Sequence, residues 1–192
     1  MIARVQRAEE TLTKHMAEAE RTNTCGGRLE GTQFRLKGEE RLKEKIAEKI
    51  EHEPSRTPAG ALRQINDAIR YTFCFEPANY SDGYRDVKQR LEAGKNRMVY
   101  SENHWHHDPE YKGINTRWMT HEGEPFEVQF HTAESFHAKQ QVTHNSYERL
   151  RNPLTEYDER RELRTFQRKV CYWITVPDGA AAIADCGQKG HG

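Results

Sequence analysis

The chain has 192 residues, with 30 Lys and Arg balanced by 30 Asp and Glu, and 34% of its residues are apolar. This length fits one domain that can bury a core, but the core must be lean and the surface strongly charged. Because no run of about 18 apolar residues occurs, a membrane-spanning helix is excluded, and the polar start predicts no secretory signal. Zero net charge gives no support to a general nucleic-acid or membrane-surface binder, although a local basic patch stays open.

Hydrophobic periodicity and turn residues divide the chain into helices and strands. In chain order they predict a helix over 2–20, a strand over 32–37, helices over 39–51 and 59–68, a strand over 69–75, a helix over 82–93, strands over 97–101, 111–121 and 125–132, and helices over 133–151 and 156–175. In the last strand Phe126, Val128 and Phe130 alternate with polar residues. This order predicts an α/β or α+β domain built on a single mixed β-sheet flanked by helices.

The predicted elements give three parts. Residues 1–31 form an N-terminal helix and linker, residues 32–176 form the folded domain, and residues 177–192 form a disordered tail. Ser81 stands just before a predicted helix, where its hydroxyl can cap the first turn.

Cations near the start of the folded part are spaced to hold phosphates. Arg35 and Lys37 share one face of a predicted strand, and Lys45 lies on the helix that follows. The motif G-x-x-x-x-G-K-S/T is absent from the sequence, so side chains would have to hold the phosphates.

Two acids and an aromatic residue complete a candidate site. Asp67 and Glu127, on different strands, can share a magnesium ion, which prefers oxygen ligands and substrate phosphates. Tyr111 offers a flat ring for a base. Cations, two acids and an aromatic platform suit nucleotide phosphotransfer, although charged strand and helix faces are also common on ordinary solvated surfaces.

Three short stretches carry a family resemblance. They are Arg35-Leu-Lys37 with Lys45, then Asp67-Ala-Ile-Arg70, then Tyr111-Lys-Gly-Ile-Asn115 with Glu127-Val-Gln129-Phe-His131. They resemble the synthetase domain of the RelA/SpoT family of (p)ppGpp synthetases. The first stretch is similar to the family motif R-x-K-x-x-x-S-x-x-x-K, and the second to the strand that carries a magnesium aspartate and a nearby arginine. The third is similar to the motifs Y-x-S/G-x-H and E-x-Q-x-R-T. The resemblance runs from about Arg35 to Arg151 and is strongest to the small, toxin-associated branch.

The resemblance implies an ATP-dependent pyrophosphokinase. Such enzymes move the β,γ-pyrophosphate of ATP to the 3′-hydroxyl of an acceptor nucleotide and release AMP. It implies a mixed sheet flanked by helices, similar to nucleotidyltransferases. The hydrolase doublet His107-Asp108 stands without the large helical domain that hydrolases of the family need, so we expect no alarmone hydrolysis.

Site residues are carried over by position. The residues implied for ATP binding are Arg35, Lys37, Arg41 and Lys45. Those implied for Mg²⁺ are Asp67 and Glu127, and those for catalysis are Glu127, Asp67 and Gln129. Those implied for acceptor binding are Tyr111, Asn115, Arg70 and His131, although Arg70 can equally be a partner for Asp67. Glu127 would be the second metal ligand or the base for the 3′-hydroxyl, Tyr111 would stack on the acceptor base, and Gln129 would orient nearby groups.

Three departures from the family pattern leave the acceptor open. Arg41 replaces the serine, Asn115 the histidine and His131 the arginine. The acceptor can then be GDP or GTP, ADP or ATP, or the 3′ end of a tRNA.

Several functions follow as expectations and alternatives. A short synthetase suits a growth-inhibiting toxin that an antitoxin or immunity protein neutralises. We expect it to act in the cytoplasm, either of its own cell or of a target cell to which it is delivered. No membrane partner is expected. The alternatives are an inactive nucleotide-binding module and a magnesium-dependent nuclease. His104 and His106 can share a strand face as a zinc pair.

Overall fold

The computed structural model describes residues 2–106 and 108–187. Its helices are α1 (Ile2–Thr22), α2 (Glu39–His52), α3 (Pro58–Leu62), α4 (Tyr80–Ala93), α5 (Ala133–His137), α6 (His144–Arg151) and α7 (Tyr157–Tyr172). Its strands are β1 (Arg28–Glu30), β2 (Arg70–Cys74), β3 (Arg97–Asn103), β4 (Ile114–Met119) and β5 (Pro125–His131). Short helical turns are η1 (Thr32–Phe34), η2 (Pro77–Asn79) and η4 (Ala180–Ala182), and η3 (Ala138–Val142) is a π-helix.

The strands form one five-stranded sheet in the order β1-β2-β5-β4-β3. Strands β2 and β5 are parallel, and every other neighbouring pair is antiparallel. The α+β class and the single mixed sheet predicted from the sequence are confirmed.

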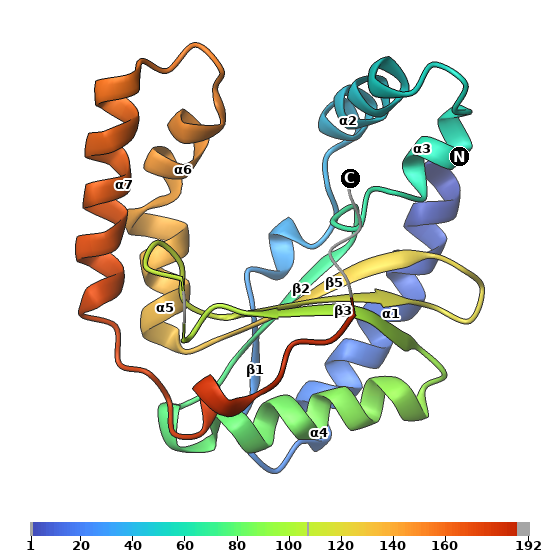
Figure 1. Cartoon of the computed structure of the whole chain (residues 1–192). Coiled ribbons are helices and arrows are strands. Elements are labelled where there is room, and N and C mark those ends of the chain that lie inside the picture. The colour runs from blue at the N-terminus through green and yellow to red at the C-terminus, as the bar shows by residue number, and fades with distance from the viewer. Residues whose placement is uncertain (1, 107, 188–192) are drawn as a thin grey trace.

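One face of the sheet builds the core. Phe126, Val128 and Phe130 of β5 are fully buried, as their alternation predicts. Helices α1 and α4 lie along this side of the sheet (Figure 1) and add buried residues such as Met16 and Val87. The opposite face carries polar residues, and the two remaining groups of helices rise on either side of it, with α2 and α3 at one end and α5 to α7 at the other (Figure 1).

The strand predicted over 32–37 is wrong. Gly31 has a positive φ of 64°, and the chain turns there into η1. Phe34 is 63% exposed, so its side chain does not pack into the core as the alternation predicts. The edge strand is instead β1, within the predicted linker, and Leu36 forms only an isolated bridge with Ile69.

The start of α4 and the helices after β5 also differ from prediction. Ser81 lies inside α4 and its hydroxyl donates to the Asp178 carbonyl at 2.7 Å instead of capping the helix. The predicted helix 133–151 is divided, because the π-turn of η3 separates α5 from α6.

The predicted disordered tail is ordered over residues 177–187. Ala180 is fully buried, and Asn103 Nδ2 donates to the carbonyls of Ala180 and Ile183 at 2.8 Å each. Backbone groups of Ser101 and Cys186 bond along the outer edge of β3. Residues 188–192 lie outside the described part of the chain. Among the described helices, none is long and apolar enough to cross a membrane.

Candidate active site

An open cleft of about 880 Å³ lies over the polar face of the sheet. Five of its lining side chains are cationic, Lys45, Lys49, Arg63, Arg70 and Arg117, and three are acidic, Asp67, Glu102 and Glu127. Because the whole chain has no net charge, this excess of cations is local. A cleft of this charge suits a polyanionic ligand.

The floor of the cleft follows from strand register. Across β2, β5, β4 and β3, one row of neighbouring residues is Arg70, Glu127, Arg117 and Tyr100. The next row is Thr72, Gln129, Asn115 and Glu102. Arg117 lies over the Tyr100 ring, with its Cζ 4.9 Å from the ring centroid. Glu127 therefore stands between two arginines, at the centre of the first row.

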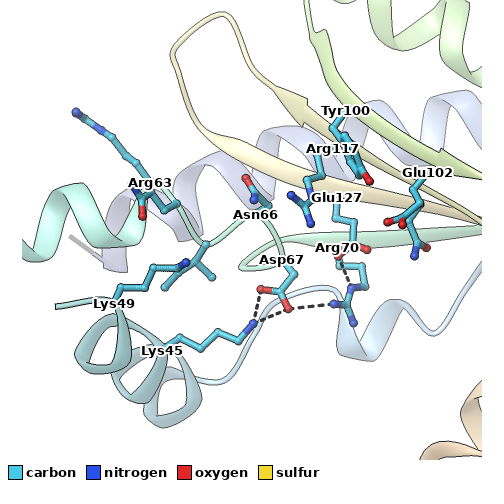
Figure 2. A pocket seen from close by; sticks show the side chains of 13 residues that line it. Lys45, Lys49, Arg63, Asn66, Asp67, Arg70, Tyr100, Glu102, Arg117 and Glu127 are labelled. Atoms are coloured by element: carbon cyan, nitrogen blue, oxygen red, sulfur yellow. Dashed lines mark hydrogen bonds and ion pairs between the residues drawn. The ribbon is translucent and has the colours of Figure 1, made fainter. Parts of the chain in front are cut away.

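Asp67 is held by three cations. Its carboxylate accepts from Lys45 Nζ at 2.9 and 3.0 Å and from Arg70 Nη2 at 3.0 Å, and it pairs with Lys37 Nζ at 3.2 Å. Figure 2 shows Lys45 and Arg70 reaching this carboxylate from two sides. Burial would raise the pKa of Asp67, but the charges of Arg70 and Lys37 and the bond from Lys45 lower it to about 2. Asp67 is thus a fixed anion that gathers cations in the cleft.

Helix α2 supplies the lysines because one of its faces is apolar. Leu42 and Ile46 pack into the core, which turns Lys45 and Lys49, four residues apart, toward the cleft. Acidic residues in the first turn of α2 and basic ones in its last turn complement the helix dipole.

Glu127 is held at both carboxylate oxygens. Arg70 Nε donates to Oε2 at 2.9 Å and Gln129 Nε2 donates to Oε1 at 2.7 Å. The Glu127 side chain is 12% exposed, so it reaches the cleft from a well-packed position. A carboxylate oriented in this way can accept a proton from a hydroxyl group placed above it.

Tyr111, Asn115 and His131 form one hydrogen-bonded cluster. The Tyr111 hydroxyl donates to Asn115 Oδ1 at 2.8 Å and lies 2.9 Å from His131 Nε2. Because that hydroxyl has one proton, His131 Nε2 must donate to it, and His131 Nδ1 accepts from Ser135 Oγ at 2.9 Å. Burial and the nearby charge of Lys139 lower the pKa of His131 well below its usual value, so the ring is neutral.

The predicted site residues thus fall into three groups. The first group joins in the cleft or at its floor: Lys37, Lys45, Asp67, Arg70, Glu127 and Gln129. The second is the cluster of Tyr111, Asn115 and His131, of which Asn115 lines the cleft. The third lies apart, because Arg35 pairs with Glu9 of α1 and Arg41 pairs with Glu44 on the exposed side of α2.

Eight lining residues are not predicted from the sequence: Lys49, Arg63, Gln64, Ile65, Asn66, Tyr100, Glu102 and Arg117. A signal was present for Arg117, since it alternates with the buried Thr116 and Trp118 and so shares a face with Asn115. Lys49 follows Lys45 at helical spacing. Arg63 and Tyr100 reach the cleft through tertiary packing, which no local pattern reports.

Asp67 and Glu127 fit magnesium by donor chemistry, because both supply hard carboxylate oxygens. Within the described residues, no group of three or more His, Cys, Asp and Glu side chains could hold a metal ion by itself. The pair therefore suits an ion that takes its remaining ligands from bound phosphates and water, as magnesium does.

No family model matches the sequence, and no curated protein matches it at a significant level. Solved structures do match. The type VI effector Tas1, solved in complex with its immunity protein, is 20% identical, with a TM-score of 0.57 over 88% of this chain and 93% of that one. The small alarmone synthetase 1 of Bacillus subtilis, bound to its product pppGpp, is 15% identical, with a TM-score of 0.52 over 88% and 87%. A GTP pyrophosphokinase family protein of Streptococcus pneumoniae is 15% identical, with a TM-score of 0.57 over 89% and 83%.

The chain has the fold of the small alarmone synthetases. The match to Tas1 extends over most of both chains. The fold agrees with the resemblance that the sequence motifs carry.

Proposed function

We propose that this protein is an ATP-dependent pyrophosphokinase that transfers the β,γ-pyrophosphate of ATP to the 3′-hydroxyl of an acceptor nucleotide. One observation carries the proposal: a single cleft on the small alarmone synthetase fold joins the cations around Asp67 to an oriented Glu127. Phosphoryl transfer depends mainly on positioning and on neutralising charge, and these residues supply both.

The cations around Asp67 are proposed to bind the ATP phosphates. Lys37 and Lys45 now pair with the Asp67 carboxylate, an anion that occupies their charge much as a phosphate would. Incoming phosphates give both lysines a second set of oxygen partners, while Lys49 and Arg63 line the outer part of the same cleft. Magnesium, when bound by Asp67 and Glu127 together with the phosphates, supplies further charge neutralisation.

Glu127 is proposed to act on the acceptor. Its carboxylate accepts the proton of the 3′-hydroxyl, and the freed oxygen attacks the β-phosphorus of ATP. The bond from the β-phosphorus to the oxygen that bridges it to the α-phosphate breaks, and that oxygen leaves with AMP. Arg70 and Gln129 hold the two carboxylate oxygens of Glu127, so the base is oriented before the acceptor arrives.

The product is proposed to be an alarmone of the (p)ppGpp or (p)ppApp type that inhibits growth. The proposed acceptors of the pyrophosphate are GDP, GTP, ADP or ATP. The expected partner of the protein is a neutralising immunity protein or antitoxin. The likeness to an effector solved with its immunity protein and to a synthetase bound to pppGpp supports this proposal.

Mass spectrometry tests the reaction and the acceptor together. Purified protein is incubated with ATP and Mg²⁺ and, in separate reactions, with GDP, GTP, ADP or bulk tRNA. We expect AMP in equal amount to an acceptor that is heavier by one pyrophosphate. If only tRNA gains a pyrophosphate, the proposed alarmone product is wrong and the product is a pyrophosphorylated tRNA. Absence of AMP with every acceptor, from protein that still binds ATP, would favour the inactive nucleotide-binding module.

A further inference from the structure

Lys139 lies behind Glu127 and takes no part in the reaction steps above. It belongs to η3, and its Nζ donates to Gln129 Oε1. Gln129 Nε2 in turn donates to Glu127 Oε1 at 2.7 Å. A short chain of hydrogen bonds therefore runs from Lys139 through Gln129 to the carboxylate that is proposed to act as the base.

The surroundings of Lys139 do not favour a cation. The side chain is half-buried, and the aromatic contact that favours its charge is a long one, with Nζ 5.9 Å from the centroid of the Phe136 ring. Among the described residues, no Asp or Glu lies within ion-pair distance of it. The charged and titratable groups that face it are Arg70 and Cys74 of β2 and Glu127 and His131 of β5. Burial, together with the charge of Arg70, lowers the pKa of Lys139 to about 8.

A π-helix places Lys139 at this point. The Thr143 N–H donates to the Ala138 carbonyl at 2.8 Å, which closes a turn one residue wider than that of an α-helix. Such turns are rare and often occur at functional sites. The turn and the poorly compensated cation are two separate features that both centre on Lys139.

We propose that Lys139 is a positioning residue that orients the Gln129 amide and thereby holds Glu127 for catalysis. This inference rests on the proposed function. An ammonium group only donates hydrogen bonds, so it selects the carbonyl oxygen of Gln129 and leaves the amide nitrogen to face Glu127. Without the ammonium group the amide keeps only its bond to Glu127 and is free to rotate away from the carboxylate, so Glu127 loses its fixed orientation.

Steady-state kinetics of Lys139→Met and Lys139→Arg tests this role. We expect Lys139→Met to lower kcat for AMP release by about tenfold or more, the usual scale for a residue that supports a reacting group, with the KM for ATP little changed. Lys139→Arg, which keeps a cationic donor, restores most of the lost kcat. In a Gln129→Met background, Lys139→Met has no further effect, because the residue through which it acts is gone.

Thermal unfolding separates positioning from a structural role. Lys139→Met removes a cation that burial disfavours, so we expect a melting temperature equal to or above that of the wild type. Loss of kcat together with a lowered melting temperature, and no recovery with Lys139→Arg, would overturn the proposal.

The Gln129 side-chain amide gives a readout that does not depend on activity. Its NMR signals, assigned by their loss in Gln129→Met, are expected to shift with pH around a midpoint near the Lys139 pKa of about 8 and to lose this shift in Lys139→Met. If wild-type protein releases no AMP but the shift is present, the proposed function fails and the positioning contact stands. If wild-type protein is active while Lys139→Met keeps full kcat, the positioning role is refuted.

Discussion

Asp67 shows how one residue can organise the cations of the cleft. The carboxylate lies next to Lys37, Lys45 and Arg70, and the side chain is 20% exposed, so the attraction is only partly screened by water. An anion in this position keeps three cations close together that would otherwise repel one another. The cations are then already in place for the phosphates that we propose they bind.

The charge of Asp67 should also stabilise the fold in a pH-dependent way. The folded-state pKa of about 2 lies below the ordinary value of 3.8, so the stabilisation is present above about pH 4 and is lost as the pH falls toward 2. From this difference we expect Asp67→Asn to cost about 2 kcal/mol of unfolding free energy at pH 7. Urea denaturation across the pH range should show the gap between wild type and variant closing below pH 4.

Asp82→Asn is a matched control for this measurement. The Asp82 side chain is 78% exposed and pairs with Arg85 on the surface of α4. Exposed pairs of this kind contribute little, so its stability should follow the wild type at every pH. An Asp67→Asn protein as stable as Asp82→Asn at pH 7 would contradict the electrostatic role of Asp67.

At the scale of elements, the turn into β4 determines how the cluster of Tyr111, Asn115 and His131 packs. Gly113 has a φ of 154°, and a Cβ built on it would lie 2.8 Å from His131 Cε1 and 2.9 Å from the Phe130 carbonyl oxygen. The His131 ring and the start of β4 therefore fit together only because position 113 has no side chain.

Gly113→Ala should disturb both the fold and the cluster around Tyr111. Compared with Gly123→Ala, which meets no atom within 4 Å and so tests a positive φ alone, we expect a further loss of about 1–3 kcal/mol. Thermal unfolding of the two variants measures this difference directly. Equal stabilities would show that the contact with His131 does not constrain this turn.

The success of prediction from sequence also differs from element to element. Strand β5 was predicted because its apolar residues alternate and are all buried, and α2 because its apolar residues follow helical spacing. Glu127 and Asp67 could be named from motifs, but their shared partner Arg70 lies between them only through the parallel pairing of β2 and β5. A long-range pairing of this kind leaves no local pattern.

Two errors have different physical origins. Phe34 and Leu36 show strand-like alternation, yet the positive φ of Gly31 turns the chain and leaves Phe34 exposed. Lys139 lies in a polar segment that reads as an ordinary helix, and its half-burial comes from the π-turn and from its contact with Gln129 of β5. In the first case a local glycine turn ends the strand pattern, and in the second tertiary contacts override it.

At the scale of the whole molecule, the fold sets two groups of helices on either side of the polar sheet face (Figure 1). Helix α2 contributes donor-side cations from one group, and η3 contributes Lys139 from the other. Strand β5 carries Glu127 between them. The sheet thus brings together residues that lie about 90 positions apart in the chain, counted from Lys45 to Lys139.

The ordered end of the chain completes the sheet. Residues 180–187 run beside β3, the edge strand, and the buried Asn103 bonds to two of their carbonyls. A chain that ends after Gly179 should melt at a lower temperature and associate at high concentration, because the β3 edge becomes accessible. Asn103→Ala should show the same loss of stability more weakly, about 1–3 kcal/mol. Unchanged melting temperature and elution volume in the shortened chain would contradict this role.

The central claim is that Glu127 and the cations around Asp67 form one catalytic site. The most direct test is the rate of AMP release by Glu127→Gln, measured alongside its ATP affinity by calorimetry. Glu122→Gln, on the exposed turn between β4 and β5, is the matched control. We predict that Glu127→Gln lowers turnover by about 10²–10³-fold while the affinity for ATP measured without Mg²⁺ is retained, and that Glu122→Gln behaves as the wild type. A folded Glu127→Gln enzyme with wild-type turnover would contradict the account.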